Sequence, residues 1–88
     1  MMLTVGQRVR GRVVRHEAYG AFVDIGESEL AALLLDALID DDPRRARDSL
    51  PAIGDEIEAV FLGYGPPRGT QPRISIRPSD FARAEPEA

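Results

Sequence analysis

The sequence predicts an all-β domain in which five short strands close into a Greek-key barrel, with a short helical insertion between the third and fourth strands. Five segments alternate apolar and polar residues with the period of two that marks half-buried strands. Turn signals recur about every 8–12 residues outside the insertion, as in small all-β domains. No amphipathic helical stretch competes with these segments, and together they match the five-stranded OB-fold barrel.

The first strand covers the alternating stretch 8–13. Its small or apolar residues should point into the barrel and its arginines outward. Glycine at an inward position suggests a tight bend, as at the corner of a small barrel. The expected inward residues are Val9, Gly11 and Val13, and the expected outward residues are Arg8, Arg10 and Arg12.

A turn at residues 18–20 leads into the second strand, 21–25. The same alternation predicts a core-facing side and an outward side for this strand. An outward phenylalanine beside a polar residue is the first indication of a binding surface. The expected inward residues are Ala21, Val23 and Ile25, and the expected outward residues are Phe22 and Asp24.

The third strand begins in the apolar run Leu30–Leu35, and a connection with helical character follows it. Asp40–Asp42 before Pro43 are typical of an N-cap followed by proline at the first helical position. A short helix over roughly residues 43–48 is therefore predicted, with the acidic residues at the favourable end of its dipole.

The fourth strand is predicted over 56–62, and the glycine- and proline-rich segment 63–71 is a loop. The last strand is predicted over 72–77. The expected inward residues of these two strands are Ile57, Ala59, Phe61, Ile74 and Ile76, and the outward ones on the last strand are Arg73, Ser75 and Arg77. One domain over residues 1–80 is expected, with a short flexible tail at 81–88.

Composition excludes several classes of protein. The 88 residues contain no cysteine, so disulfides and thiolate metal sites are excluded. The first residues lack the basic and apolar regions of a signal peptide. The longest apolar run, Leu30–Leu35, is far shorter than the roughly 20 residues of a membrane span. We therefore expect a cytoplasmic protein with no membrane partner.

Residues that resemble catalytic or metal-binding groups do not form a plausible site. His16 is the only histidine and stands beside Glu17, with no nucleophile in view, so we expect no enzymatic activity and no catalytic residue. Asp40–Asp42 lack the alternating spacing and terminal glutamate of a calcium loop. We expect neither a metal site nor a cofactor.

Charge is unevenly distributed along the chain. The net charge of −4 argues against strong non-specific attraction to phosphates, because that attraction is driven by basic side chains. Residues 1–16 carry four arginines and no acid, whereas residues 17–58 carry twelve acids against three arginines. Every one of the eleven Lys and Arg positions is arginine, which a GC-rich genome explains most simply; the alternative is a preference for planar, bidentate donors.

Four short motifs in order resemble the S1 (S-one) RNA-binding domain family, the repeat family of the largest small-subunit ribosomal protein. They cover about residues 5 to 77. They are Val5–Val13, an opening turn with a Val-x-Gly-x-Val strand; Tyr19–Gly26, the most specific segment of the family; Gly54–Ile57, a fourth-strand opening; and Arg73–Ile76, a closing strand.

The resemblance implies binding of single-stranded RNA on one face of the barrel, with bases stacked on exposed aromatic side chains. Tyr19 and Phe22 match the stacking aromatics of the family, and Arg73 falls at or near its basic contact on the last strand. The strand pattern itself adds Arg10 and Arg12, because both should face outward on the neighbouring strand.

The sequence departs from the family at two places. Ala32–Leu35 stand where the family has a Gly-Leu-x-His strand, so its glycine and histidine are both replaced. After the fourth strand, where the family often has aspartate, Tyr64 offers a substitute aromatic. An exposed leucine on the third strand would suit a protein partner as well as a base. The alternative hypothesis is therefore a protein-interaction module that uses the third-strand leucines.

Overall fold

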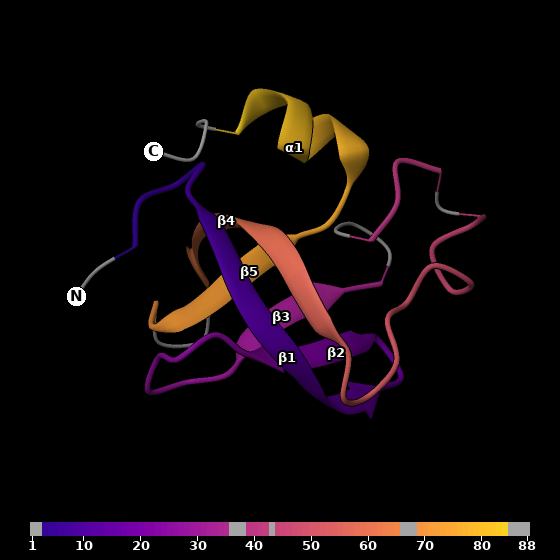
Figure 1. The fold of residues 1–88 in the computed structure, drawn as a ribbon, viewed down its shortest axis with the longest axis horizontal. Coiled ribbons are helices and arrows are strands. Elements are labelled where there is room, and N and C mark those ends of the chain that lie inside the picture. The colour runs from indigo at the N-terminus through magenta and orange to yellow at the C-terminus, as the bar shows by residue number, and fades with distance from the viewer. Residues whose placement is uncertain (1–2, 36–38, 43, 66–68, 85–88) are drawn as a thin grey trace.

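Five strands close into a barrel in the computed structural model, which describes residues 3–35, 39–42, 44–65 and 69–84 (Figure 1). The order around the barrel is β1-β2-β3-β5-β4, with β4 pairing back onto β1. Only the β3–β5 pair is parallel. The predicted five-stranded barrel is therefore confirmed. Its elements are β1 (Arg8–Glu17), β2 (Gly20–Asp24), β3 (Ala31–Leu34), β4 (Glu56–Gly65), β5 (Gln71–Ser75) and α1 (Pro78–Arg83).

The barrel core is built from the inward positions that strand alternation predicts. Val13, Val23 and Ile74 are completely buried, and Phe61 is among the largest fully buried side chains. Val9, Ile25, Ile57 and Ile76 are partly buried and pack against this core. Burying such side chains stabilises a fold by about 1.5–3 kcal/mol each.

β1 approaches β2 so closely at Gly11 that a side chain there has no room. A β-carbon on Gly11 would lie 2.6 Å from both the carbonyl oxygen of Asp24 and Cγ1 of Val23. Glycine is therefore required for this close approach, since any other residue would push the two strands apart.

The predicted helix between β3 and β4 is wrong in detail. Residues 44–49 form hydrogen-bonded turns, and no α-helix is assigned among the described residues of this connection. Asp42 accepts a hydrogen bond from the backbone of Arg44 and forms an ion pair with its side chain, and these local bonds favour turns over a continuing helix. Ile39 and Ala46 anchor the connection in the core. Pro43 and residues 36–38 lie outside the described residues.

The helix of this domain follows β5 instead. α1 lies at one end of the barrel (Figure 1) and packs on β4. Ser75, predicted to face solvent, is completely buried because α1 folds back over it and places Asp80 within hydrogen-bonding reach of its hydroxyl. α1 includes residues 81–83, which belong to the predicted tail at 81–88, so this part of the tail is helical. Residues 85–88 lie outside the described residues. No helix in the described ranges is long and apolar enough to cross a membrane.

Asp80 fixes α1 to the barrel. Its side chain is 5% exposed and accepts hydrogen bonds from Ser75, Arg77 and Arg83. Burial raises the pKa of Asp80, but the hydrogen bonds from Arg77, Ser75 and Arg83 outweigh it and leave the pKa below its ordinary value. The carboxylate is therefore ionised at neutral pH and holds the helix by charge-assisted hydrogen bonds.

Candidate nucleic-acid interface

One row of side chains crosses four neighbouring strands on the outer face of the barrel. Arg15 of β1 pairs with Phe22 of β2, Phe22 with Ala32 of β3, and Ala32 with Arg73 of β5. Paired residues of neighbouring strands point to the same face of a sheet. We call Arg15, Phe22, Ala32 and Arg73 the outer row. It brings together two of the predicted site residues, Phe22 and Arg73.

Tyr19 extends the outer row at the turn before β2. Its ring meets the Phe22 ring edge to face, with centroids 6.2 Å apart at 86°. Tyr19 is 55% exposed, so its ring is open to solvent. Phe22 faces outward as expected, but it is only 9% exposed because the guanidinium of Arg15 covers its ring, with Cζ 4.6 Å from the centroid. The open aromatic surface is therefore that of Tyr19.

Arg73 lies at the other end of the outer row. Its Nε is buried, and no group in the described part of the chain hydrogen-bonds to it. Its side chain lies in the space that a β-carbon on Gly65 would occupy, and Gly63 pairs with it directly. A buried donor without a partner is uncommon in proteins.

The structure places Arg10 and Arg12 apart from the outer row, on the side of the barrel formed by β1 and β4. Arg10 lies opposite Glu58 in the strand pairing, and Arg12 forms an ion pair with Glu56 at 3.1 Å. Acidic residues thus face this part of β1. Arg12 also pairs with Asp24 of β2, two residues from Phe22, so it lies on the same outer face as Phe22 but outside the outer row.

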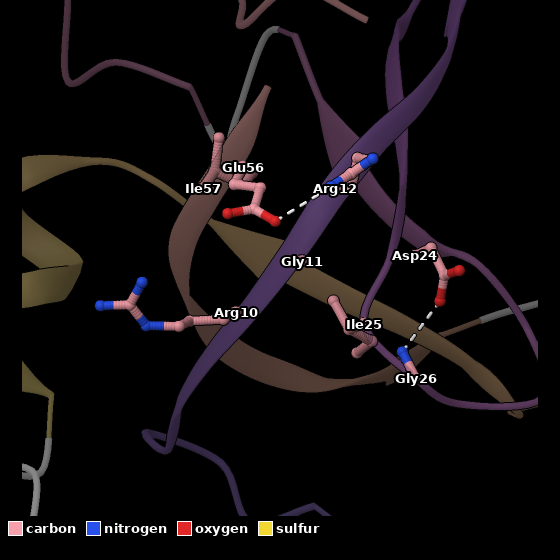
Figure 2. A pocket seen from close by; sticks show the side chains of 8 residues that line it. All are labelled: Arg10, Gly11, Arg12, Asp24, Ile25, Gly26, Glu56 and Ile57. Carbon is pink, nitrogen blue, oxygen red and sulfur yellow. Dashed lines mark hydrogen bonds and ion pairs between the residues drawn. The ribbon is translucent and has the colours of Figure 1, made fainter. Parts of the chain in front are cut away.

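Arg10 and Arg12 line a shallow pocket of about 320 Å³ (Figure 2). Its polar side chains bind one another or the backbone: Arg12 reaches Glu56, and Asp24 accepts a hydrogen bond from the amide of Gly26. Arg10 points away from this group in Figure 2. Because cations and carboxylates alternate around the pocket, it does not attract a ligand of one charge.

Arg15, which the sequence reasoning missed, is the arginine of β1 that reaches Phe22. The cause is a bulge, because Val13 pairs with Val23 and Arg15 with Phe22, which leaves Val14 as an extra residue. A β-bulge shifts the alternation of a strand by one position. Strict alternation from Arg12 places Arg15 inside the barrel. In the sequence the bulge is indicated by the adjacent valines Val13 and Val14, which break the alternating pattern. In the structure Val14 is exposed.

Tyr64 does not join the outer row. Its ring packs against Phe61, with centroids 4.9 Å apart, and its hydroxyl accepts a hydrogen bond from the amide of Leu3 at 3.3 Å. Tyr64 pairs with the buried Pro72, one position away from the glycines that flank Arg73. The structure therefore gives it a packing role at this end of the barrel.

The third-strand leucines form no exposed ridge. Leu33 is completely buried in the core, and Leu34 and Leu35 are half-buried and pack against it. Within the described ranges the exposed large apolar residues are Val5, Val14, Tyr19 and Ile53, none of which lies on β3. The apolar surface that the protein-interaction hypothesis requires at β3 is not present there.

A closed five-stranded barrel with an aromatic and arginine row on its outer face defines a nucleic-acid-binding module of the OB type. The chain belongs to the S1 RNA-binding domain family, whose sequence model matches residues 3–66. The resemblance inferred from the four motifs is therefore confirmed. A search among curated protein sequences gave no match.

Solved structures share the fold. GSP13 from Bacillus subtilis has a TM-score of 0.71 and 24% identity, over 98% of this chain and 62% of that one. The alpha subunit of aIF2 from Pyrococcus abyssi has a TM-score of 0.70 and 22% identity, over 88% and 30%. The a/eIF2alpha–aDim2p–rRNA complex from Pyrococcus horikoshii OT3 has a TM-score of 0.68 and 25% identity, over 88% and 46%. The chain thus spans less than two thirds of each of these three proteins.

Proposed function

We propose that this domain binds single-stranded RNA through Tyr19 and the outer row, with weak sequence preference and without catalysis. The observation that carries the proposal is the placement of an open aromatic, a second aromatic and Arg73 on one face of the barrel. The Pyrococcus horikoshii relative was solved in a complex with rRNA, which supports RNA as the ligand.

Stacking supplies the main attraction in this proposal. An aromatic face binds any unstacked base, and each stacked base contributes about 1–3 kcal/mol. Tyr19 offers such a face, and the guanidinium of the half-buried Arg73 offers donors to a phosphate or a base oxygen. Duplex RNA keeps its bases stacked on one another, so single strands are the preferred form.

Affinity should be low. The net charge of −4 and the carboxylate of Glu17 beside Arg15 oppose the approach of phosphates. We expect dissociation constants no tighter than about 1 μM at physiological salt, weakening further as salt rises. A cytoplasmic location is part of the same proposal, and the lack of cysteine is consistent with it.

A fluorescence-anisotropy titration tests the proposal. The probe is a labelled single-stranded RNA of about 12 nucleotides, within the length that one OB fold covers. We expect saturable binding at about 50 mM salt that weakens at about 200 mM. Tyr19→Ala and Phe22→Ala should each weaken it, and Ile53→Ala, which removes an equally exposed apolar side chain away from the outer row, should not.

Two results would count against RNA binding. If the folded wild-type domain shows no saturation at hundreds of micromolar, roughly the upper limit of non-specific nucleic-acid affinities, the proposal is wrong. If Ile53→Ala weakens binding as much as Tyr19→Ala, the contact does not lie at the outer row. A protein partner would then be the function to test next.

A further inference from the structure

We infer that Arg15, rather than Phe22, presents the second stacking surface for a base, with its guanidinium lying between the Phe22 ring and the RNA. This inference rests on the proposed function and deepens it. Phe22 is 9% exposed, because the guanidinium of Arg15 lies over its ring and Tyr19 closes its side. A base therefore cannot reach the Phe22 face while Arg15 keeps this position.

Arg15 is held in place from two directions. Its Nε forms an ion pair with Glu17 at 3.0 Å, and its Cζ lies 4.6 Å from the Phe22 centroid. The direct pairing of Arg15 with Phe22 across β1 and β2 sets the position of the arginine Cα. The Arg15 side chain is nevertheless 56% exposed, so the surface turned away from Phe22 is open. The guanidinium is thus positioned before any ligand arrives.

The chemistry of the guanidinium suits a stacked base. It is planar, more weakly hydrated than an ammonium group, and stacks on aromatic faces. Single-stranded RNA recognition uses such planes as well as aromatic rings to hold unstacked bases. The inferred arrangement is therefore a Phe22–Arg15–base stack next to a base on Tyr19, and its ligand is an unpaired segment with at least two free bases.

Two other roles for Arg15 are less consistent with its surroundings. A phosphate bound by Arg15 would lie close to the Glu17 carboxylate, which repels it. A cover that the RNA displaces would require the loss of both the ion pair and the contact with Phe22 before binding. A base on the outer surface of the guanidinium preserves both contacts.

Arg12 provides a matched control for the test. It lies on the same strand as Arg15 and also forms an ion pair with a glutamate, but its guanidinium reaches Glu56 of β4 and not the Phe22 ring. Arg12→Ala and Arg15→Ala therefore remove the same charge and the same type of ion pair. The difference between them measures the local contact rather than the overall electrostatic attraction.

The experiment titrates Arg15→Ala, Arg15→Lys and Arg12→Ala with the same RNA at two salt concentrations. We expect Arg15→Ala to weaken binding about 5- to 150-fold, the range for the loss of one stacked base. Arg15→Lys should recover little of this loss, because lysine keeps the charge but not the plane. Arg12→Ala should change the affinity by no more than about threefold.

Each contrary result has a distinct meaning. If Arg15→Lys binds with wild-type affinity, Arg15 is a phosphate contact. If Arg15→Ala binds more tightly than wild type, Arg15 is a cover that RNA displaces. Either result would overturn this inference and leave the proposed function in place. A loss of affinity in Arg12→Ala equal to that in Arg15→Ala would also overturn this inference. Absence of binding by the folded wild-type domain would overturn the proposed function and this inference together. Circular dichroism of each variant establishes that it is folded.

A second readout does not depend on affinity. In a nitrogen-edited NMR titration, the Nε–Hε resonance of Arg15 should shift when RNA is added, since a base would stack on that group. The corresponding resonance of Arg12 should stay in place. A shift of the Arg12 resonance with none at Arg15 would contradict the inferred arrangement.

Discussion

The side chain of Arg73 lies across Gly65 of the neighbouring strand, in the space that a β-carbon there would occupy. The atoms that would overlap with this β-carbon are Nε, Cδ and Cζ of Arg73, the far part of a flexible side chain. Gly63, which pairs directly with Arg73, also lacks a side chain. Two glycines of β4 thus leave a path for the arginine and determine where its guanidinium emerges.

Gly65→Ala should displace Arg73 without unfolding the barrel. The φ angle of Gly65 is not among the positive values that favour glycine, so alanine fits the backbone. We expect a stability change of less than about 1 kcal/mol, because the overlap is relieved by moving a side chain. RNA affinity should fall about as far as it does in Arg73→Ala.

A double-mutant cycle checks this mechanism. If Gly65→Ala acts through Arg73, combining it with Arg73→Ala should cause no additional loss of RNA affinity. Losses that add in full would show that Gly65 influences binding by another route. Urea unfolding of the same proteins separates a loss of affinity from a loss of structure.

The strand pattern predicted the barrel well because the alternation of apolar residues is set by burial. Val13, Val23, Ala59 and Ile74 all belong to the buried core, where period-two alternation places them. α1 gave no comparable signal, since six residues are too few to show a helical repeat. Its main link to the barrel is polar, through Asp80, and hydrophobic patterning does not detect such links.

The candidate site was only partly predictable for a different reason. Tyr19, Phe22 and Arg73 were predicted from the family resemblance, and Phe22 and Arg73 also keep the outward positions that strand alternation gives them. Arg15 was missed, and Arg10 and Arg12 were included, because the bulge at Val14 and the acidic residues opposite β1 depend on how strands pair. The pairing partners of a residue cannot be inferred from the sequence of its own strand.

Asp80→Asn should destabilise the domain by about 1–3 kcal/mol at neutral pH, because it weakens three hydrogen bonds to a side chain that is 5% exposed. The folded-state pKa of Asp80 lies below the ordinary value of 3.8. Its contribution is therefore fully present above 3.8 and is lost as the pH falls through the lower folded-state pKa.

Urea unfolding between about pH 7 and pH 3 tests this dependence. The stability difference between wild type and Asp80→Asn should stay constant down to about pH 5 and shrink below about pH 4. Asp48→Asn, which removes an exposed carboxylate elsewhere, should cost less than about 0.5 kcal/mol. A difference that grows on acidification would contradict the assigned hydrogen bonds.

Gly11→Ala should destabilise the barrel by at least about 1–3 kcal/mol, the usual cost of overpacking a tight interior. The new β-carbon would meet the backbone oxygen of Asp24, which cannot move without separating β1 from β2. Thermal unfolding monitored by circular dichroism measures the loss. An unchanged melting temperature would show that the two strands are less closely packed than the structure indicates.

The bulge at Val14 separates the arginines of β1 that lie opposite β4 from the arginine that lies against Phe22 of β2. Before it, Arg10 and Arg12 lie opposite Glu58 and Glu56 of β4; after it, Arg15 lies against Phe22 of β2. Arg10 and Arg15 share no pairing partner, so the free-energy effects of substituting them should add. The strand can therefore change its charge on the β4 side, for solubility or for another contact, while the surface beside Phe22 is left intact.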